Sequence, residues 1–340
     1  MNYTEIKKYL SPEYKIVITS HMSPDADAVG SSVALRNTIL DFGGTATIVL
    51  PDEYPEFISW MSPDIKILKA NTDIEKVEKV VSEADVVFLL DYNNLSRVGE
   101  VLGSLIEKSS AVKILVDHHQ QPDEFDYVFS DTKASSTCEM IFDLIEKVNY
   151  LNHLDTLGAE AIYAGIMTDT GNFRFNSTSQ RTHEVAAKLL NHGVVPDKIY
   201  HLIHDQNSVD RLKLLGFVIE NRMKYYKALN TICFYLTLQD KKDFNFKKGD
   251  SEGFVNYGLS VRGVVFSVFF SEDEKLVKMS FRSKGDFNVN QFARTHFSGG
   301  GHFNAAGGRS LDSIDDTVLN FSKLITTYKE PLTNVKIYNK

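Results

Sequence analysis

Residues 14–27, YKIVITSHMSPDAD, contain the pattern that decides the fold of the first half of the chain. The β-branched run 14–20 predicts a strand, a Ser/Pro/Asp loop follows it, and a helical pattern extends from about Ala28 to Asp41. Similar apolar runs recur at residues 45–50, 86–90 and 112–116. Continuous apolar runs that alternate with helical segments indicate a parallel sheet buried on both faces, so we predict an α/β first domain.

The second part of the chain has a different character. Residues 135–206 are mostly helical in pattern, with a break at 193–196. Apolar runs at residues 228–238, 261–270 and 276–281 predict strands, with little helix before about Asn290. This pattern predicts a smaller α+β second domain. We therefore expect a first domain over residues 1–195, a helical linker over 196–220 and a second domain over 221–340.

Composition excludes several classes of protein. The chain has 340 residues, of which 43% are hydrophobic and 24% charged, so it has ample material for packed cores and is not disordered. No apolar run approaches the roughly 20 residues of a membrane helix, and no basic flank precedes an apolar segment at the N-terminus. Cys138 and Cys233 are too few for a disulfide scaffold. We expect a cytoplasmic protein that does not bind a membrane.

The net charge of −8 is divided unevenly along the chain. Residues 1–220 contain 19 Lys and Arg against 33 Asp and Glu, net −14, whereas residues 221–340 contain 18 against 12, net +6. This asymmetry favours a first domain that gathers carboxylates and a second domain that receives anions. Two solvated surfaces without a ligand would give the same counts. The total argues against long duplex nucleic acid, which needs an extended basic track.

Acidic and imidazole side chains follow the predicted strands of the first domain. They are His21, Asp25 and Asp27 after the first strand, Asp91 after the run 86–90, Asp117, His118 and His119 after the run 112–116, and Asp169 where a later helical pattern ends. The carboxyl ends of parallel strands lie at one edge of a sheet, where open α/β folds bind ligands. We therefore expect these side chains to meet.

So many carboxylates at one edge repel one another unless cations neutralise them. A pair of divalent metal ions would do this, and mixed imidazole and carboxylate donors suit Mn²⁺ better than Ca²⁺, with Mg²⁺ or Co²⁺ as substitutes. Such pairs, about 3.5–4 Å apart, serve enzymes that hydrolyse phosphate esters. Each acid also has a structural explanation, because Asp25 or Asp27 could cap a helix and Asp169 could lie in a turn.

These motifs, in order and spacing, resemble the four motifs of the DHH phosphoesterase superfamily. The glycine run at 299–307, GGGHFNAAG, resembles the signature of the associated DHHA1 domain. The two-domain layout is similar to the branch of bifunctional oligoribonucleases (nano-RNases) and 3′-phosphoadenosine-5′-phosphate (pAp) phosphatases. The resemblance implies an active-site cleft between the two domains. It also implies hydrolysis of very short RNAs to mononucleotides and of pAp to AMP.

The resemblance also assigns roles at matching positions. One Mn²⁺ would be held by His21, Asp25 and Asp91, and the other by Asp27, Asp91, His118 and Asp169, with Asp91 bridging. His119 would face the scissile phosphate, and Asp117 would orient an imidazole, as partners of metal-bound histidines do. A water molecule activated by the two ions would be the nucleophile.

The second domain contains candidates for binding the substrate phosphate. Gly299, Gly300 and Gly301 would let backbone N–H groups approach an anion, and His302 adds a further donor. Arg282, followed by Ser283, lies near the end of a predicted strand, where its guanidinium could hold a terminal phosphate. Arg262 is a further candidate, with a surface arginine as the alternative.

Two other kinds of function stay open on the sequence. Pyrophosphatases, polyphosphatases and hydrolases of linear or cyclic dinucleotides share the motifs of the first domain, although the glycine–histidine run departs from the pyrophosphatase pattern. A non-catalytic nucleotide-binding protein would also retain the fold, but no expected metal ligand is missing. A homodimer is an open alternative to a monomer.

Overall fold

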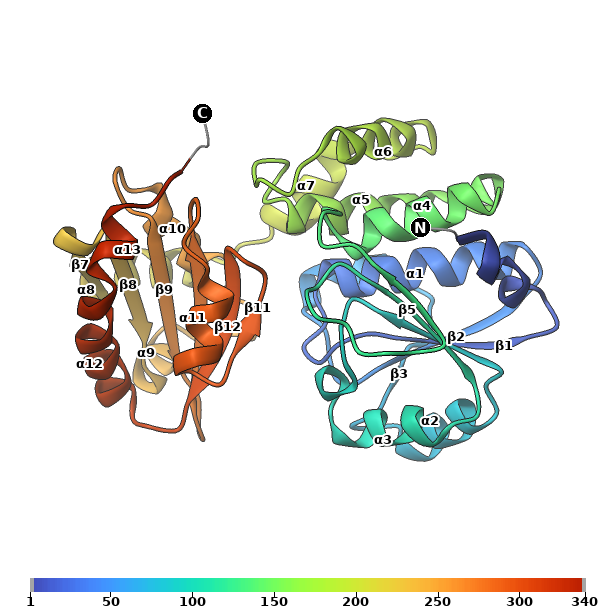
Figure 1. The fold of residues 1–340 in the computed structure, drawn as a ribbon, viewed down its shortest axis with the longest axis horizontal. Coiled ribbons are helices and arrows are strands. Elements are labelled where there is room, and N and C mark those ends of the chain that lie inside the picture. The colour runs from blue at the N-terminus through green and yellow to red at the C-terminus, as the bar shows by residue number, and fades with distance from the viewer. Residues whose placement is uncertain (1–2, 338–340) are drawn as a thin grey trace. The chain divides into compact units, whose positions relative to one another are not determined.

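A computed structural model describes residues 3–337 of the chain. The chain divides into two compact units, residues 1–206 and 207–340, each built around its own sheet (Figure 1). The division lies inside the segment 196–220 that the sequence predicts as a linker, and the predicted boundaries stay a prediction. An active-site cleft between the two domains likewise stays a prediction.

The first unit contains a six-stranded sheet in the order β3-β2-β1-β4-β5-β6. Its strands are β1 (Lys15–Thr19), β2 (Thr45–Leu50), β3 (Leu68–Lys69), β4 (Val86–Leu90), β5 (Val112–Asp117) and β6 (Tyr127–Ser130). Every pairing in this sheet is parallel. The parallel sheet predicted from the apolar runs is therefore confirmed.

Helices cover both faces of this sheet (Figure 1). The helices are α1 (Ala26–Asp41), α2 (Ile74–Ser82), α3 (Glu100–Lys108), α4 (Thr137–Lys147), α5 (Thr156–Asp169), α6 (Gln180–Asn191) and α7 (Pro196–His204). Alternate residues of β1 belong to different cores: Ile16 and Ile18 pack with α1, α4 and α5, whereas Val17 packs with α2 and α3. Burial on both faces explains why the strands are continuously apolar. Short 3₁₀ segments complete the unit at Tyr3–Leu10, Glu56–Met61, Leu95–Val98 and Leu151–His153.

The second unit contains a mixed six-stranded sheet in the order β11-β12-β10-β9-β8-β7. Its strands are β7 (Met223–Tyr226), β8 (Thr231–Leu236), β9 (Phe266–Glu272), β10 (Val277–Ser283), β11 (Gly300–Gly301) and β12 (Ala305–Ser310). Strands β8 and β9 are parallel and the other pairs are antiparallel. The predicted α+β character of this unit is confirmed.

The helices of the second unit are α8 (Val209–Asn221), α9 (Leu238–Asp243), α10 (Phe254–Ser260), α11 (Val289–His296), α12 (Ile314–Leu324) and α13 (Lys329–Thr333), with 3₁₀ turns at Lys227–Leu229 and Ile325–Tyr328. Helices α9 and α10 lie in the region where the sequence predicts little helix. Helix α9 begins with a capping box between Thr237 and Asp240, and the Asp240 carboxylate also binds Arg222 at 2.8 Å and 2.9 Å. Side-chain caps and a long-range ion pair thus stabilise a helix too short to give a periodic signal.

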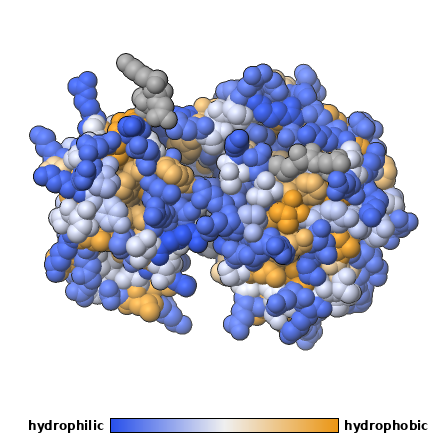
Figure 2. All heavy atoms as spheres, in the orientation of Figure 1, coloured by the Kyte–Doolittle hydropathy of each residue, from blue (hydrophilic) through white to orange (hydrophobic). Residues whose placement is uncertain are grey.

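The visible face of each unit is mostly hydrophilic, with small apolar patches (Figure 2). None of the helices within residues 3–337 combines the length and the apolar character that a bilayer-spanning segment requires.

Helices α1 and α5 approach each other closely at Gly30. A Cβ atom at Gly30 would lie 2.5 Å from the carbonyl oxygen of Ala161 and 3.1 Å from Cys138 Sγ. Since a backbone oxygen cannot move aside cheaply, this contact requires glycine. The close packing is what brings the end of α5 beside the beginning of α1.

We expect Gly30→Ala to reduce the free energy of unfolding by about 1–3 kcal/mol, because the added methyl group overpacks the crossing. The matched control is Gly216→Ala in α8, where a Cβ atom meets nothing within 4 Å. That change should stabilise its helix by up to about 1 kcal/mol. Thermal unfolding of both variants checks this, and an unchanged melting temperature for Gly30→Ala would contradict it.

Candidate metal centre

The predicted residues of the first unit meet at the carboxyl edge of its sheet. His21 lies two residues beyond the end of β1, Asp91 directly follows β4, and Asp117 is the last residue of β5. Strand β4 pairs in parallel with both β1 and β5, so all three strands end at the same edge. The topology therefore explains why residues almost 100 positions apart become neighbours.

Asp25 and Asp27 enter the site from the start of α1. Asp25 is the N-cap, and its Oδ1 accepts hydrogen bonds from the backbone N–H of Asp27 at 3.0 Å and of Ala28 at 3.1 Å. The capping role that the sequence offers as an alternative is thus real for Asp25. It does not exclude metal binding, because a carboxylate oxygen can accept a bond and still ligate a cation.

Asp91 has an unusual backbone conformation, with φ of +64°. Residues other than glycine rarely adopt this left-handed backbone conformation, although aspartate and asparagine do so more readily than most. Its carboxylate is 2% exposed and lies between two imidazoles. His21 Nε2 is 3.3 Å from Asp91 Oδ2, and His118 Nε2 is 3.5 Å from Asp91 Oδ1. The two oxygens of one carboxylate therefore face different histidines.

Three groups of donor atoms include Asp91, and two of them are built around His21 and His118. In the first, His21 Nε2 also lies 3.9 Å from Asp25 Oδ1. In the second, His118 Nε2 lies 3.7 Å from Asp27 Oδ2 and 3.3 Å from Asp169 Oδ2, which α5 contributes from its last residue. The donor atoms of His21, Asp25 and Asp91 lie within 4.8 Å of one another, as do those of Asp27, Asp91 and His118. Both groups combine imidazole nitrogen and carboxylate oxygen, a donor set that fits divalent cations such as Mn²⁺.

His119 and Asp117 form the third group with Asp91, and the donor atoms of these three residues also lie within 4.8 Å of one another. His119 Nδ1 lies 2.7 Å from Asp117 Oδ1, and Asp117 is fully buried. A hydrogen bond from Nδ1–H to this carboxylate fixes the tautomer and leaves Nε2 as the ring's other polar atom. His119 Nδ1 also lies 3.7 Å from Asp91 Oδ1, so the pair adjoins the candidate centre.

The charges in this site perturb one another strongly. Burial, together with the charge of Asp91, raises the pKa of Asp27 to about 7. Burial alone would lower the pKa of His21, but its bond to Asp91 and the charges of Asp25 and Asp91 outweigh that effect and raise the pKa to about 9. Burial raises the pKa of Asp169 as well, with the charge of Asp27 adding to the effect. The raised pKa values of Asp27 and Asp169 reflect burial and repulsion between neighbouring carboxylates, and a bound cation would relieve the same repulsion.

The start of α4 also takes part in this site, and the sequence gives no indication of this. The backbone N–H groups of Thr137 and Cys138 donate to Asp27 Oδ2 and Oδ1, each at 2.7 Å, and the Thr137 hydroxyl donates to Asp91 Oδ1 at 3.0 Å. Ser136 caps the helix by accepting from Glu139 N–H at 3.0 Å. The run from Ser136 to Glu139 is a capping pattern that predicts a helix start, but nothing in it predicts that a buried aspartate binds there.

The glycine run of the second unit is part of a hairpin. Gly300 and Gly301 form β11 and pair with Gly307 and Ala306 of β12. The N–H of Gly301 donates to Asn290 Oδ1 at 3.1 Å, so that group is already used inside the unit. A Cβ atom at Gly299 would overlap the backbone of Gly307, so the close packing of the chain at this position requires glycine. Anion binding by this run stays a prediction.

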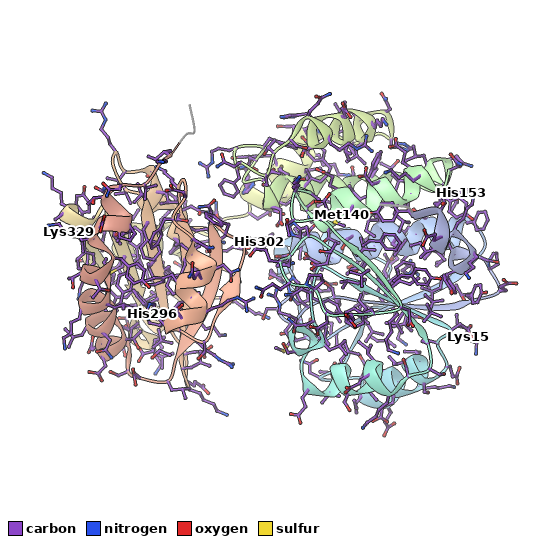
Figure 3. The ribbon with its side chains drawn as sticks, viewed as in Figure 1. Lys15, Met140, His153, His296, His302 and Lys329 are labelled. Carbon is purple, nitrogen blue, oxygen red and sulfur yellow. The ribbon has the colours of Figure 1, made fainter. Side chains whose placement is uncertain are left out.

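The remaining candidates of the second unit lie at different places. His302 lies in the turn between β11 and β12 (Figure 3), where its N–H donates to Ala305 O at 2.7 Å. The register pairs Arg282 with Ala305, so Arg282 is at the same end of the hairpin. Ser283 Oγ donates to Phe287 O at 2.6 Å and accepts from Asn304 at 2.8 Å. Arg262 is exposed in the turn before β9.

Comparisons with known proteins agree with this architecture. Residues 15–166 match the model of the DHH family, N-terminal domain, and residues 230–329 match the model of the DHHA1 domain. The chain is 28% identical to the bifunctional oligoribonuclease and PAP phosphatase NrnA of Bacillus subtilis, with 96% of this chain and 99% of that protein covered. It is 32% identical to the protein of the same name from Thermus thermophilus, with 90% and 89% covered.

A solved structure resembles the whole chain. The crystal structure of an exopolyphosphatase-related protein from Bacteroides fragilis is 37% identical and has a TM-score of 0.93, with 98% of both chains covered. Together with the matches above, this likeness confirms the family predicted from the motifs. The chain belongs to the DHH family and has a DHHA1 domain as its second domain.

Proposed function

We propose that this chain is a Mn²⁺-dependent phosphoesterase that hydrolyses very short RNAs to mononucleotides and dephosphorylates pAp to AMP. The observation that carries the proposal is that the two carboxylate oxygens of Asp91 face different histidines. Oδ2 faces His21 and Oδ1 faces His118. One carboxylate shared by two donor groups is the arrangement of two-metal hydrolases. The names of the relatives from B. subtilis and T. thermophilus include both activities, which supports the choice of substrates.

In this proposal the two donor groups hold two divalent cations. His21, Asp25 and Asp91 would bind one, and Asp27, Asp91, His118 and Asp169 the other. Bound there, the cations supply Lewis acidity toward the phosphate and a water molecule of lowered pKa as nucleophile. Mg²⁺ or Co²⁺ would replace Mn²⁺ at the same oxygen and nitrogen donors.

The protein's own groups orient the substrate. His119, held at Nδ1 by Asp117, presents Nε2 toward the scissile phosphate. Arg282 and His302 of the second domain bind the terminal phosphate, with the glycine run beside them. Ser283 and Arg262 are weaker parts of this assignment, because the Ser283 hydroxyl already makes two bonds within its own unit.

Hydrolysis of linear or cyclic dinucleotides, pyrophosphate or polyphosphate is the nearest alternative, since it would use the same donor groups. A nucleotide-binding protein without activity is the alternative from another class. The cytoplasmic location, the homodimer and the exclusion of long duplexes remain predictions from the sequence.

We expect the purified chain with Mn²⁺ to hydrolyse both a linear diribonucleotide and pAp faster than pyrophosphate. Release of mononucleotide and of inorganic phosphate measures the rates. Turnover of pyrophosphate alone would favour the alternative substrate class. Absence of turnover with bound Mn²⁺ would favour the binding protein.

We expect Asp91→Asn to reduce turnover more than about 100-fold. Mutating a residue that only hydrogen-bonds to a metal ligand already lowers metal affinity or activity by about 10–100-fold, and Asp91 is itself a proposed ligand. Asparagine also tolerates the left-handed backbone of this position, so the fold should persist. Circular dichroism and turnover of pAp measure the two effects. Asp64→Asn, an exposed aspartate of the same unit, is the control and should retain activity.

We expect Asp117→Asn to lower turnover by about 10–100-fold while Mn²⁺ affinity stays at the wild-type value, because the change affects the orientation and tautomer of His119. Calorimetric titration with Mn²⁺ and steady-state kinetics separate the two quantities. A parallel loss of metal affinity would show instead that Asp117 supports the metal groups.

A further inference from the structure

Thr137 touches both buried carboxylates of the second donor group. Its backbone N–H donates to Asp27 Oδ2 at 2.7 Å, and its hydroxyl donates to Asp91 Oδ1 at 3.0 Å. Thr137 itself is fully buried, so water cannot replace either bond. These are bonds across 110 and 46 positions of sequence, and each ends on a proposed metal ligand.

The two bonds select particular oxygens. Asp91 Oδ1, which Thr137 binds, is the oxygen that faces His118, whereas Asp91 Oδ2 faces His21. Asp27 Oδ2, which Thr137 also binds, lies 3.7 Å from the same His118 nitrogen. Thr137 therefore holds the two oxygens that face His118, whereas Asp91 Oδ2, the oxygen that faces His21, accepts no hydrogen bond from Thr137.

Asp91 needs such a partner because its backbone is in the left-handed region. A residue in this backbone conformation persists only where the surrounding structure holds it, and the contacts of its side chain belong to that structure. The hydroxyl of Thr137 is a neutral donor to Asp91 Oδ1, the oxygen that faces His118.

We propose that Thr137 is a positioning residue that orients Asp91 and Asp27 and thereby sets the metal affinity of the group around His118 separately from that of the group around His21. The inference rests on the metal-binding part of the proposed function and is independent of the substrate. A hydroxyl at this position is a specific requirement, since a methyl group of the same shape would leave Asp91 Oδ1 without its donor.

The test is a calorimetric titration of the substrate-free protein with Mn²⁺. We expect two binding events in the wild type and a selective weakening of one event, by about 10–100-fold, in Thr137→Val. Thr137→Ser retains the hydroxyl and should keep both affinities. If Thr137→Val does not fold, the comparison of Thr137→Ala with Thr137→Ser gives the same contrast.

Thr38→Val is the matched control. Thr38 is a buried threonine in α1 whose hydroxyl has no hydrogen-bond partner within residues 3–337, so the same chemical change should leave both affinities unchanged. Equal weakening of both events, or a Thr137→Ser variant as weak as Thr137→Val, would overturn the proposal. Because the titration contains no nucleotide, a failure of the proposed substrates would leave this result unaffected.

Discussion

The repulsion between carboxylates buried at one edge of the first sheet is the constraint on which the rest of this structure depends. Asp27 is fully buried and Asp91 is 2% exposed, and both lie within 4 Å of the same His118 nitrogen. The fold compensates with backbone N–H groups at the start of α4, with imidazoles and with one hydroxyl. An amide dipole or a neutral hydroxyl removes only part of the charge, so the site retains a demand for cations.

Much of this site could be predicted from the sequence because, in a parallel sheet, the residues that follow each strand lie at the same edge. Once β1, β4 and β5 are recognised as buried parallel strands, their carboxyl ends must share an edge, and the polar residues after them must meet. Asp169 was harder to place, because it belongs to the end of a helix. Its position depends on the packing of α5 against α1 through Gly30, and no local pattern in the sequence reports that contact.

Other parts could not be predicted for identifiable physical reasons. The bonds to Asp27 come from the backbone N–H groups of Thr137 and Cys138. The side-chain types at these two positions therefore do not indicate the bonds. Strand β12 begins with alanines and glycines and lacks the apolar alternation that marks a half-buried strand. For the glycine run before it, the sequence predicts anion binding, which stays a prediction, and gives no indication of strand. In the structure part of it is a strand, because the absence of Cβ atoms lets β11 and β12 approach closely.

The contact between Asp27 and the start of α4 also has a consequence for the order in which the first unit folds. The helix that holds the carboxylate is separated from it by 110 residues of sequence, and Asp169 comes later still. Chains that depend on such distant contacts fold slowly, since a long loop must close before the contact forms. During synthesis from the N-terminus, the first acidic residues therefore emerge well before their neutralising partners exist. The centre is a late product of folding, assembled only when nearly the whole first unit is in place.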